Sequence, residues 1–482
     1  MDKKFSKKNV VINMIWRFLE KSSTQLISFI IGAIIARVID TNAFGVIAIV
    51  NAFISIIDEF IENGLCLSLY QKKCPDDLDY STVFITDLII STILYIVLYF
   101  CAPIIANYYK MPQLIVLLRV SGLSLIISTI RSIQRSYVSK NMMFKKFFFS
   151  SLGGIIFSGI VGIWMAVSGF GVWALIVSPF VENIINILIN YITIKWRPKL
   201  GFSFERLKES FGYSSKLFLA FSLENIYDRL RQLIIGKRYS PSDLAYYDKG
   251  ESIPRKLTNS LESSVKSVIK PVLSDCQDDK DRTKQIVKKY LEINFLFMTP
   301  ILLGIAAVAD SIVEIVYTKK WLFVVPYLRA FCIIKLFNPI KISHQYVIRS
   351  SKRSEELLKL ELICKAYGLV VLFITSKISV FAIVAGLLVC NLIDQIVSSF
   401  YCNKFIDYTY FQQIKDVLVY IILGGIMYLI VVFVERIQIS LVLTLSIQII
   451  IGGIVYVLGI IIFKPEVFKM TYSFIKDTLF KN

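Results

Sequence analysis

Charged side chains recur inside stretches that are otherwise apolar, three or four residues apart, so that they share one face of a helix. In the first such stretch Arg17, Glu20 and Lys21 lie opposite Phe18 and Leu26. A charge at the centre of a bilayer costs roughly 2.5 to 3.5 kcal/mol even on the lenient insertion scale. We therefore expect these side chains to line water or to pair with one another. An arginine there offers a planar fork to phosphate or carboxylate oxygens.

Four further stretches have a polar face of the same kind. The polar faces are Asn51, Ser55, Asp58, Glu59 and Glu62; Glu224, Asn225, Asp228, Arg229, Arg231 and Gln232; Asp248, Glu251, Ser252 and Arg255; and Lys335, Asn338, Lys341, His344 and Gln345. The carboxylates either neutralise neighbouring cations or bind a coupling ion, and these candidates are Asp58, Glu59, Glu62, Glu224, Asp228 and Glu251.

Composition assigns the chain to the membrane. Of its 482 residues 56% are hydrophobic and 18% are charged, and the mean hydropathy is +0.65. These values are too apolar for an ordinary soluble protein, and the long apolar runs do not resemble the ten-residue alternation of an outer-membrane barrel. We predict an all-α polytopic membrane protein.

Apolar runs of about the length that crosses a bilayer predict about fourteen spans. They lie near residues 10–38, 43–68, 80–104, 112–130, 147–168, 171–194, 211–236, 243–270, 290–316, 321–347, 357–376, 379–402, 414–434 and 438–463. The domains predicted from them are an N-lobe at 1–194, a basic cytoplasmic linker at 195–210, a C-lobe at 211–402, and an extra helix pair with a tail at 403–482. The span at 243–270 is the most polar, and a helix on the membrane surface is its alternative.

A repeat with an offset of 200 residues connects the two predicted lobes. Ile34, Ile35, Asp40, Thr41, Phe44 and Gly45 fall on Ile234, Ile235, Ser240, Pro241, Leu244 and Ala245 without a gap. Each copy is typical of a helix, a tight turn with capping residues, and a second helix. Since six spans separate the copies, both have the same orientation, and the repeat is of the parallel kind found in transporters.

The basic residues gather in alternate loops, which predicts the orientation in the membrane. The N-terminus and the loops near 131–146, 195–210, 270–289 and 349–359 hold most of the Lys and Arg, whereas the opposite loops, such as DTNAFG and SGFGVW, hold few. We expect both termini to be cytoplasmic. The first apolar helix lacks a convincing cleavage site, so we expect it to be retained as a span.

Other classes of function lack their signatures. The net charge of +19 is spread over loops rather than over a compact basic domain, which argues against nucleic-acid binding. The eight cysteines are scattered and predict reduced thiols, and we expect no cofactor and no metal. No nucleotide-binding, serine-hydrolase or zinc-protease motif is present, which predicts that the protein is not an enzyme. His344 is expected to make an ordinary polar contact, and the acidic run at 75–79 is expected to be a solvated loop.

Three segments carry a resemblance to a known family. They are ARVIDTNAFGVIAI, GFGVWALI with the basic loop after it, and LAYYDKGESIPRKLTNSLESSVKSVIKPVLSDCQDD. With them the chain resembles the Wzx-like polysaccharide exporters of the colanic-acid and teichuronic-acid type, in the multidrug/oligosaccharidyl-lipid/polysaccharide superfamily. The resemblance implies a V-shaped, two-lobed transporter of twelve core helices plus two.

The resemblance also implies a function. Relatives move an undecaprenyl-diphosphate-linked oligosaccharide across the bacterial cytoplasmic membrane, with the diphosphate and sugars in a cationic cavity. Matched to this sequence, the cavity cations are Arg17, Lys21, Arg229, Arg231, Lys249 and Arg255. Membrane lipids, coupling H⁺ or Na⁺, a polysaccharide polymerase and chain-length machinery are the other implied partners.

Three alternatives stay open. A cation-coupled multidrug antiporter of the same superfamily would use the acidic face of Asp58, Glu59 and Glu62. A membrane-bound glycan enzyme would turn over a lipid-linked sugar. A scaffold for polymer assembly would tolerate mutation of the cavity charges.

Overall fold

The computed structural model consists of helices and connecting turns, with no strand among the residues that it describes. It describes residues 7–62, 65–72, 74–194, 197, 199, 201–276, 279–350, 354–435 and 440–463. Within these helices the side chains of 7–11, 14, 62, 67, 70–71, 212–224, 260–275, 349–350 and 354 are not described.

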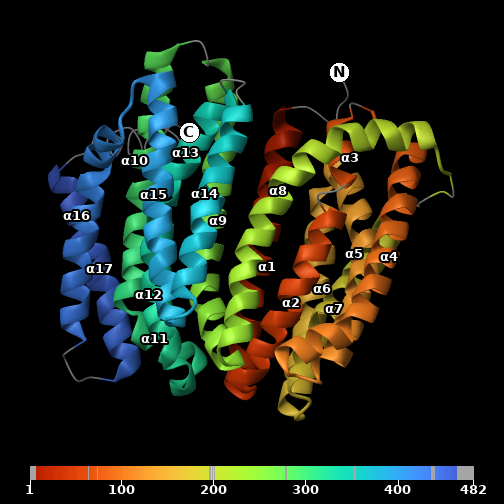
Figure 1. The fold of residues 1–482 in the computed structure, drawn as a ribbon. Coiled ribbons are helices and arrows are strands. Elements are labelled where there is room, and N and C mark those ends of the chain that lie inside the picture. Colours follow the sequence, from red (N-terminus) through yellow and green to blue (C-terminus); the bar gives the residue numbers. More distant parts are fainter. Residues whose placement is uncertain are drawn as a thin grey trace. The chain divides into compact units, whose positions relative to one another are not determined.

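The chain divides into two compact units, Met1–Ala245 and Tyr246–Asn482. Unit 1 holds eight helices and the first residues of a ninth, α9 (Figure 1). Its helices are α1 (Lys7–Val38), α2 (Thr41–Glu62), α3 (Cys66–Gln71), α4 (Asp77–Tyr109), α5 (Leu114–Lys140), α6 (Phe144–Val167), α7 (Val172–Thr193) and α8 (Phe204–Arg238). Helix α8 is in this unit because it packs on α2, α3 and α4.

Unit 2 holds most of α9 (Pro241–Asp275) and all later helices. These are α10 (Lys280–Ala307), α11 (Ala309–Tyr317), the 3₁₀ segment η2 (Lys319–Val324), α12 (Val325–Leu336), α13 (Asn338–Ser350), α14 (Ser354–Thr375), α15 (Val380–Ile406), α16 (Tyr410–Val434) and α17 (Leu441–Phe463). The lobe and linker boundaries predicted from the sequence stay a prediction.

Eleven helices in the described part are long and apolar enough to cross a membrane. Three predicted spans, now α8, α9 and α14, are not among them. Helix α14 is absent from this set because five charges fall in its first twelve positions: Glu355, Glu356, Lys359, Glu361 and Lys365. The all-α polytopic class is confirmed, and the total of fourteen spans stays a prediction.

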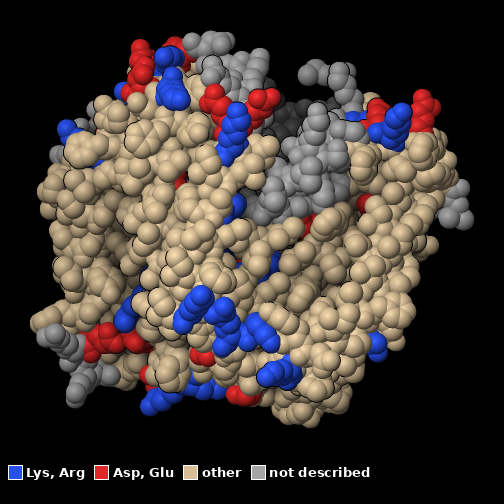
Figure 2. Space-filling model, viewed as in Figure 1, with Lys and Arg blue, Asp and Glu red and all other residues tan. Residues whose placement is uncertain are grey.

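The helices expose apolar side chains outward and use small and polar residues where they pack together. Large apolar side chains of α4 are exposed on one stripe, with Ile89, Ile93 and Ile96 followed by Phe100. Charged residues on the face in Figure 2 gather mostly near helix ends. Inside unit 1, α6 and α7 approach closely at small residues, and the hydroxyls of Ser158 and Ser178 lie 2.8 Å apart. Small residues and interhelical hydrogen bonds are the usual packing devices of membrane helices.

The repeat offset of 200 residues is confirmed by the helix bounds. Helix α1 ends at Val38 and α2 begins at Thr41, whereas α8 ends at Arg238 and α9 begins at Pro241. The second turn is capped at Ser240, whose hydroxyl accepts a hydrogen bond from the Asp243 amide at 3.1 Å. The Asp243 carboxylate in return accepts from the Ser240 amide at 3.1 Å, as in a capping box.

The two equivalent turns pack directly against each other inside unit 1, and we call this the tip contact (Thr41, Gly45, Gly236, Pro241 and Ser242). A Cβ atom on Gly45 would lie 1.7 Å from the backbone oxygen of Pro241. One on Gly236 would lie 2.7 Å from the Ile49 side chain. The Thr41 hydroxyl donates to the Ser242 hydroxyl at 3.1 Å. Glycine is therefore required for this approach, because any side chain at 45 would force the backbones apart.

The acidic run at 75–79 is not a solvated loop, so that prediction was wrong. Asp79 is 4% exposed, and its Oδ1 accepts from Lys72 Nζ at 2.9 Å and from Arg206 Nη1 at 2.8 Å. Arg206 also contacts Asp76 Oδ1 at 2.5 Å. Because Arg206 belongs to α8, these four residues fasten the start of α8 to the start of α4, and we call them the latch.

Candidate functional site

The candidate site residues fall on four helices of the two units. Unit 1 carries Arg17 and Lys21 on α1, Asp58, Glu59 and Glu62 on α2, and Glu224, Asp228, Arg229 and Arg231 on α8. Unit 2 carries Lys249, Glu251 and Arg255 on α9. The side chains of Glu62 and Glu224 lie outside the described residues.

Two carboxylates of α2 are engaged by neutral side chains. Asp58 Oδ1 accepts a hydrogen bond from the Ser128 hydroxyl of α5 at 2.6 Å. Glu59 Oε2 accepts from the Asn225 amide of α8. Helix α2 of the first repeat is thus tied to α8 of the second through a polar contact, which agrees with the predicted polar faces of these helices. Both carboxylates are half-buried.

The two candidate arginines of α8, Arg229 and Arg231, differ in their partners. Arg231 is 6% exposed; its guanidinium donates to Asp228 Oδ1 at 2.5 Å and lies 5.2 Å from the Tyr227 ring centroid. Arg229 Nη1 donates instead to the neutral Gln232 Oε1 at 3.1 Å. The Nε atoms of Arg229 and Arg231 are both buried without a hydrogen-bond partner among the described residues. In the same part of the chain, no carboxylate lies within ion-pair distance of Arg229, and its hydrogen-bond partner is the neutral Gln232.

On α1, the Arg17 guanidinium lies against α6. Arg17 Nη1 and Glu20 Oε2 are 2.8 Å apart, with Glu20 nearly buried. The same guanidinium lies 5.8 Å from the Phe144 ring centroid and 5.5 Å from that of Phe147, both on α6. An ion pair and two aromatic faces fix Arg17 at the start of α6. Lys21, one turn along from Arg17, is half-buried.

On α9 the charges are enclosed by aromatic and basic neighbours. Lys249 Nζ lies 5.6 Å from the Tyr317 ring centroid and 5.9 Å from that of Trp321. Glu251 is 8% exposed and lies 3.8 Å from Lys335 Nζ of α12. Arg255 is half-buried. Sequence reasoning missed the aromatic partners of Lys249, because an apolar stretch gives no signal of which ring faces a cation.

Unit 2 also contains a polar cluster that the sequence only partly indicated. Lys341 Nζ contacts Asp394 Oδ2 at 2.8 Å, and the Tyr367 hydroxyl donates to the other carboxylate oxygen. Lys341 was on a predicted polar face, whereas Asp394 and Tyr367 were missed because their partners lie far away in the chain. His344 makes ordinary polar contacts, as expected, with Ser398 Oγ at 2.7 Å and Gln413 Oε1 at 2.8 Å.

Comparison with known proteins decides the family. The sequence profile of the family described as "Polysaccharide biosynthesis protein" matches residues 34–326, which is more than half of the chain. The chain belongs to this family. The matched part of the chain runs from the end of α1 into α12, and so includes both turns of the tip contact.

Curated relatives have names that agree with the family. The chain is 22% identical over 324 residues to the succinoglycan biosynthesis transport protein ExoT of Rhizobium meliloti, covering 67% of this chain and 65% of that one. It is 20% identical to the lipopolysaccharide biosynthesis protein WzxC of Escherichia coli, covering 64% and 63%. The teichuronic acid biosynthesis protein TuaB of Bacillus subtilis is 20% identical, covering 61% and 62%. The match spans slightly less than two thirds of the length of each of these three relatives.

Solved structures show the same fold. The lipid II flippase MurJ in an inward closed conformation superposes with a TM-score of 0.73 at 16% identity, covering 95% of this chain and 100% of that one. An inward-facing multidrug resistance transporter of the MATE family gives a TM-score of 0.60 at 13% identity, covering 80% and 94%. The chain is a multi-pass membrane protein with the fold of these transporters.

Proposed function

We propose that this protein is a flippase that moves an undecaprenyl-diphosphate-linked oligosaccharide across the bacterial cytoplasmic membrane by alternating access. The family and the printed names of its relatives support transport in polysaccharide biosynthesis. The MurJ fold supports a lipid-linked cargo, since that protein is named as a lipid II flippase. The cytoplasmic location of both termini, coupling to H⁺ or Na⁺, and partnership with a polymerase and chain-length machinery belong to the same proposal.

Arg229 is the observation that carries the chemical part of the proposal. Arg229 is half-buried and donates to a neutral partner, whereas Arg231 on the same helix donates to a carboxylate, so the guanidinium of Arg229 is the one poised for an anion. A diphosphate offers several oxygens to the forked guanidinium of Arg229, and the low dielectric constant of the protein interior strengthens that contact. Lys249 and Arg255 on α9 and Arg17 and Lys21 on α1 are the further cations that we assign to the cargo.

The experiment compares two arginines on one helix. In a strain that lacks the gene, Arg229→Gln is expected to abolish surface export of the glycan while the protein stays at its normal level in the membrane. Arg231→Gln is the matched control, since Arg231 is buried and already paired with the Asp228 carboxylate, so its loss removes a structural contact. It should lower the amount of protein and lower export in proportion. Normal export by Arg229→Gln would contradict the assignment of this residue.

The other candidate is a cation-coupled multidrug antiporter, which the MATE fold and the acidic face of α2 favour. Asp58 and Glu59 would then bind the coupling ion or drug. Drug resistance and glycan export, measured in the same deletion strain, separate the two functions. Loss of export without a change in drug resistance supports the flippase, and the reverse result supports the antiporter.

A further inference from the structure

The first turns of α8 have two different faces. Arg206 and Leu207 point toward the other helices of unit 1, as their contacts show. Phe204, Lys208 and Phe211 are exposed, and their spacing of four and three residues places them on one stripe of the helix. The sequence indicated only a basic linker here, since this segment precedes the predicted span at 211–236.

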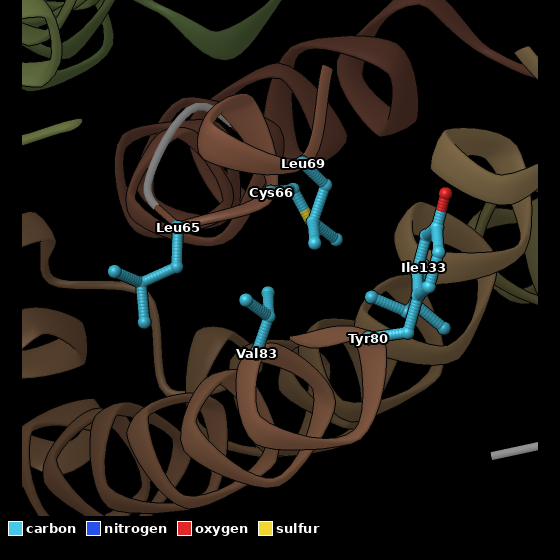
Figure 3. Close-up of a cluster of buried hydrophobic side chains, with 6 residues drawn as sticks. All are labelled: Leu65, Cys66, Leu69, Tyr80, Val83 and Ile133. Atoms are coloured by element: carbon cyan, nitrogen blue, oxygen red, sulfur yellow. The ribbon is translucent and has the colours of Figure 1, made fainter. Parts of the chain in front are cut away.

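The inner face is fixed by polar and apolar contacts together. Arg206 is held by the latch, and the Ser203 amide donates to the Thr82 hydroxyl of α4 at 3.1 Å. Leu207 packs against a buried cluster of Leu65, Cys66, Leu69, Tyr80, Val83 and Ile133. Figure 3 shows these six side chains converging between α3, α4 and α5. The rotation of α8 about its own axis is therefore set at this point, and with it the direction of the outer stripe.

The outer stripe is more apolar than a water-facing helix requires. Phe204 is 73% exposed and Phe211 is 62% exposed, and Phe202 just before the helix is 51% exposed. Large exposed aromatic residues that share one stripe mark a surface that another phase or molecule covers. Lys208 lies between the two helical phenylalanines, so its ammonium is available to a headgroup phosphate while its stem covers apolar surface.

The position of this stripe beside the start of α4 indicates what covers it. The Ser203 amide is bonded to Thr82 in the second turn of α4, and α4 is a candidate span that begins at Asp77. Helix α8 therefore begins beside the first turns of this candidate span, and Ile89 and Ile93 are exposed about two turns further along α4. In Figure 1 the start of α8 crosses over the ends of α3 and α4, as their packing also indicates.

We propose that residues 202–211 form an in-plane membrane anchor. Phe204 and Phe211 lie at the boundary between headgroups and acyl chains, and Lys208 contacts anionic headgroups, as in interfacial amphipathic helices. The opposite flank, with Glu205 exposed and Glu209 3.1 Å from Lys72 Nζ, faces water. The anchor holds the start of α8 at a constant depth whatever cargo the protein carries.

Spin labels at neighbouring positions test the anchor. Cys74 and Cys101 are replaced by serine, because the other six cysteines are buried. Single Phe204→Cys, Phe211→Cys and Glu205→Cys variants carry a nitroxide in phosphatidylethanolamine/phosphatidylglycerol vesicles. Collisions with oxygen should exceed those with a water-soluble nickel chelate at 204 and 211, and the order should reverse at 205. Equal accessibility to nickel at 204 and 205 would overturn the proposal.

A second measurement separates lipid from a protein partner. In native membranes a label at 204 should give the same oxygen-to-nickel ratio as in the pure lipid vesicles. Shielding from both reagents in native membranes, with exposure to nickel in vesicles, would show that a protein covers the stripe and would overturn the lipid assignment. The outcome does not depend on transport, so it is independent of the proposed flippase function.

Discussion

Helix α8 is fastened to helices of the first repeat near both of its ends, and the two contacts differ in kind. The tip contact at its end is uncharged and close-packed, with Gly45 against the Pro241 backbone. The latch at its start is ionic, with Arg206 shared between Asp76 and Asp79. A close-packed contact is sensitive to added volume, whereas a partly exposed ionic one is sensitive to charge and tolerates small shifts. We therefore expect a substitution that adds volume to disrupt the tip contact completely. Substitutions that remove charge should weaken the latch only in part.

The strongest test of this difference joins the two turns covalently. Thr41→Cys with Ser242→Cys places two thiols where hydroxyls now lie 3.1 Å apart. If the turns separate in each transport cycle, oxidation should abolish glycan export and a reductant should restore it. Each single variant is the control and should export normally under both conditions. Undiminished export by the cross-linked protein would show that the tip contact does not open.

Added volume at the tip contact should have the next largest effect. Gly45→Ala puts a methyl group 1.7 Å from the Pro241 oxygen, and we expect a loss of about 3 kcal/mol from overpacking. Thermal unfolding of the purified protein measures this loss. Gly32→Ala is the matched control, since nothing lies within 4 Å of a Cβ at that helical glycine. Equal unfolding temperatures for the two variants would contradict the close packing.

Charge removal in the latch should have a smaller effect. Asp79→Asn leaves Lys72 and Arg206 without their shared carboxylate, at an expected cost of about 1.5 kcal/mol. Faster proteolysis in the segment 197–203 would report it. Asp77→Asn is the control, because its pair with Lys199 is exposed on both sides and should contribute little. Identical cleavage of the two variants would mean that the latch does not hold α8.

The smallest effect is expected from pH. The Asp79 amide and the Arg206 guanidinium lower the pKa of Asp76 from its ordinary 3.8, so the contribution of Asp76 is complete above that value and is lost as pH falls through the lowered one. The hydrogen bond to Asp79 raises the pKa of Lys72 above 10.5. Its contribution is complete below 10.5 and is lost as pH rises further. Cleavage near residue 200 should thus be constant between about pH 5 and 9, and a change in that window would contradict the latch.

The polar faces were predictable where charges recur at helical spacing. Arg229, Arg231 and Asp228 were indicated because three charged residues in one apolar run are rarely accidental. Asp394 was not predictable, since its partner Lys341 is 53 positions away in the chain. The acidic run at 75–79 was misinterpreted for a similar reason: its partner Arg206 is more than a hundred residues distant.

By itself, the sequence determined the membrane class, the helical fold and the offset of 200 residues between the two helix–turn–helix copies. These properties depend on composition and on periodicity along one segment, which neighbouring residues encode. Only the tertiary structure decided that the two copies pack turn against turn, that Arg229 and Arg231 have unlike partners, and that Arg206 closes a latch on α4. The turn-against-turn contact and the latch join distant segments, whereas the partners of Arg229 and Arg231 lie three residues away on the same helix. All of these contacts depend on distances and burial that no local pattern contains.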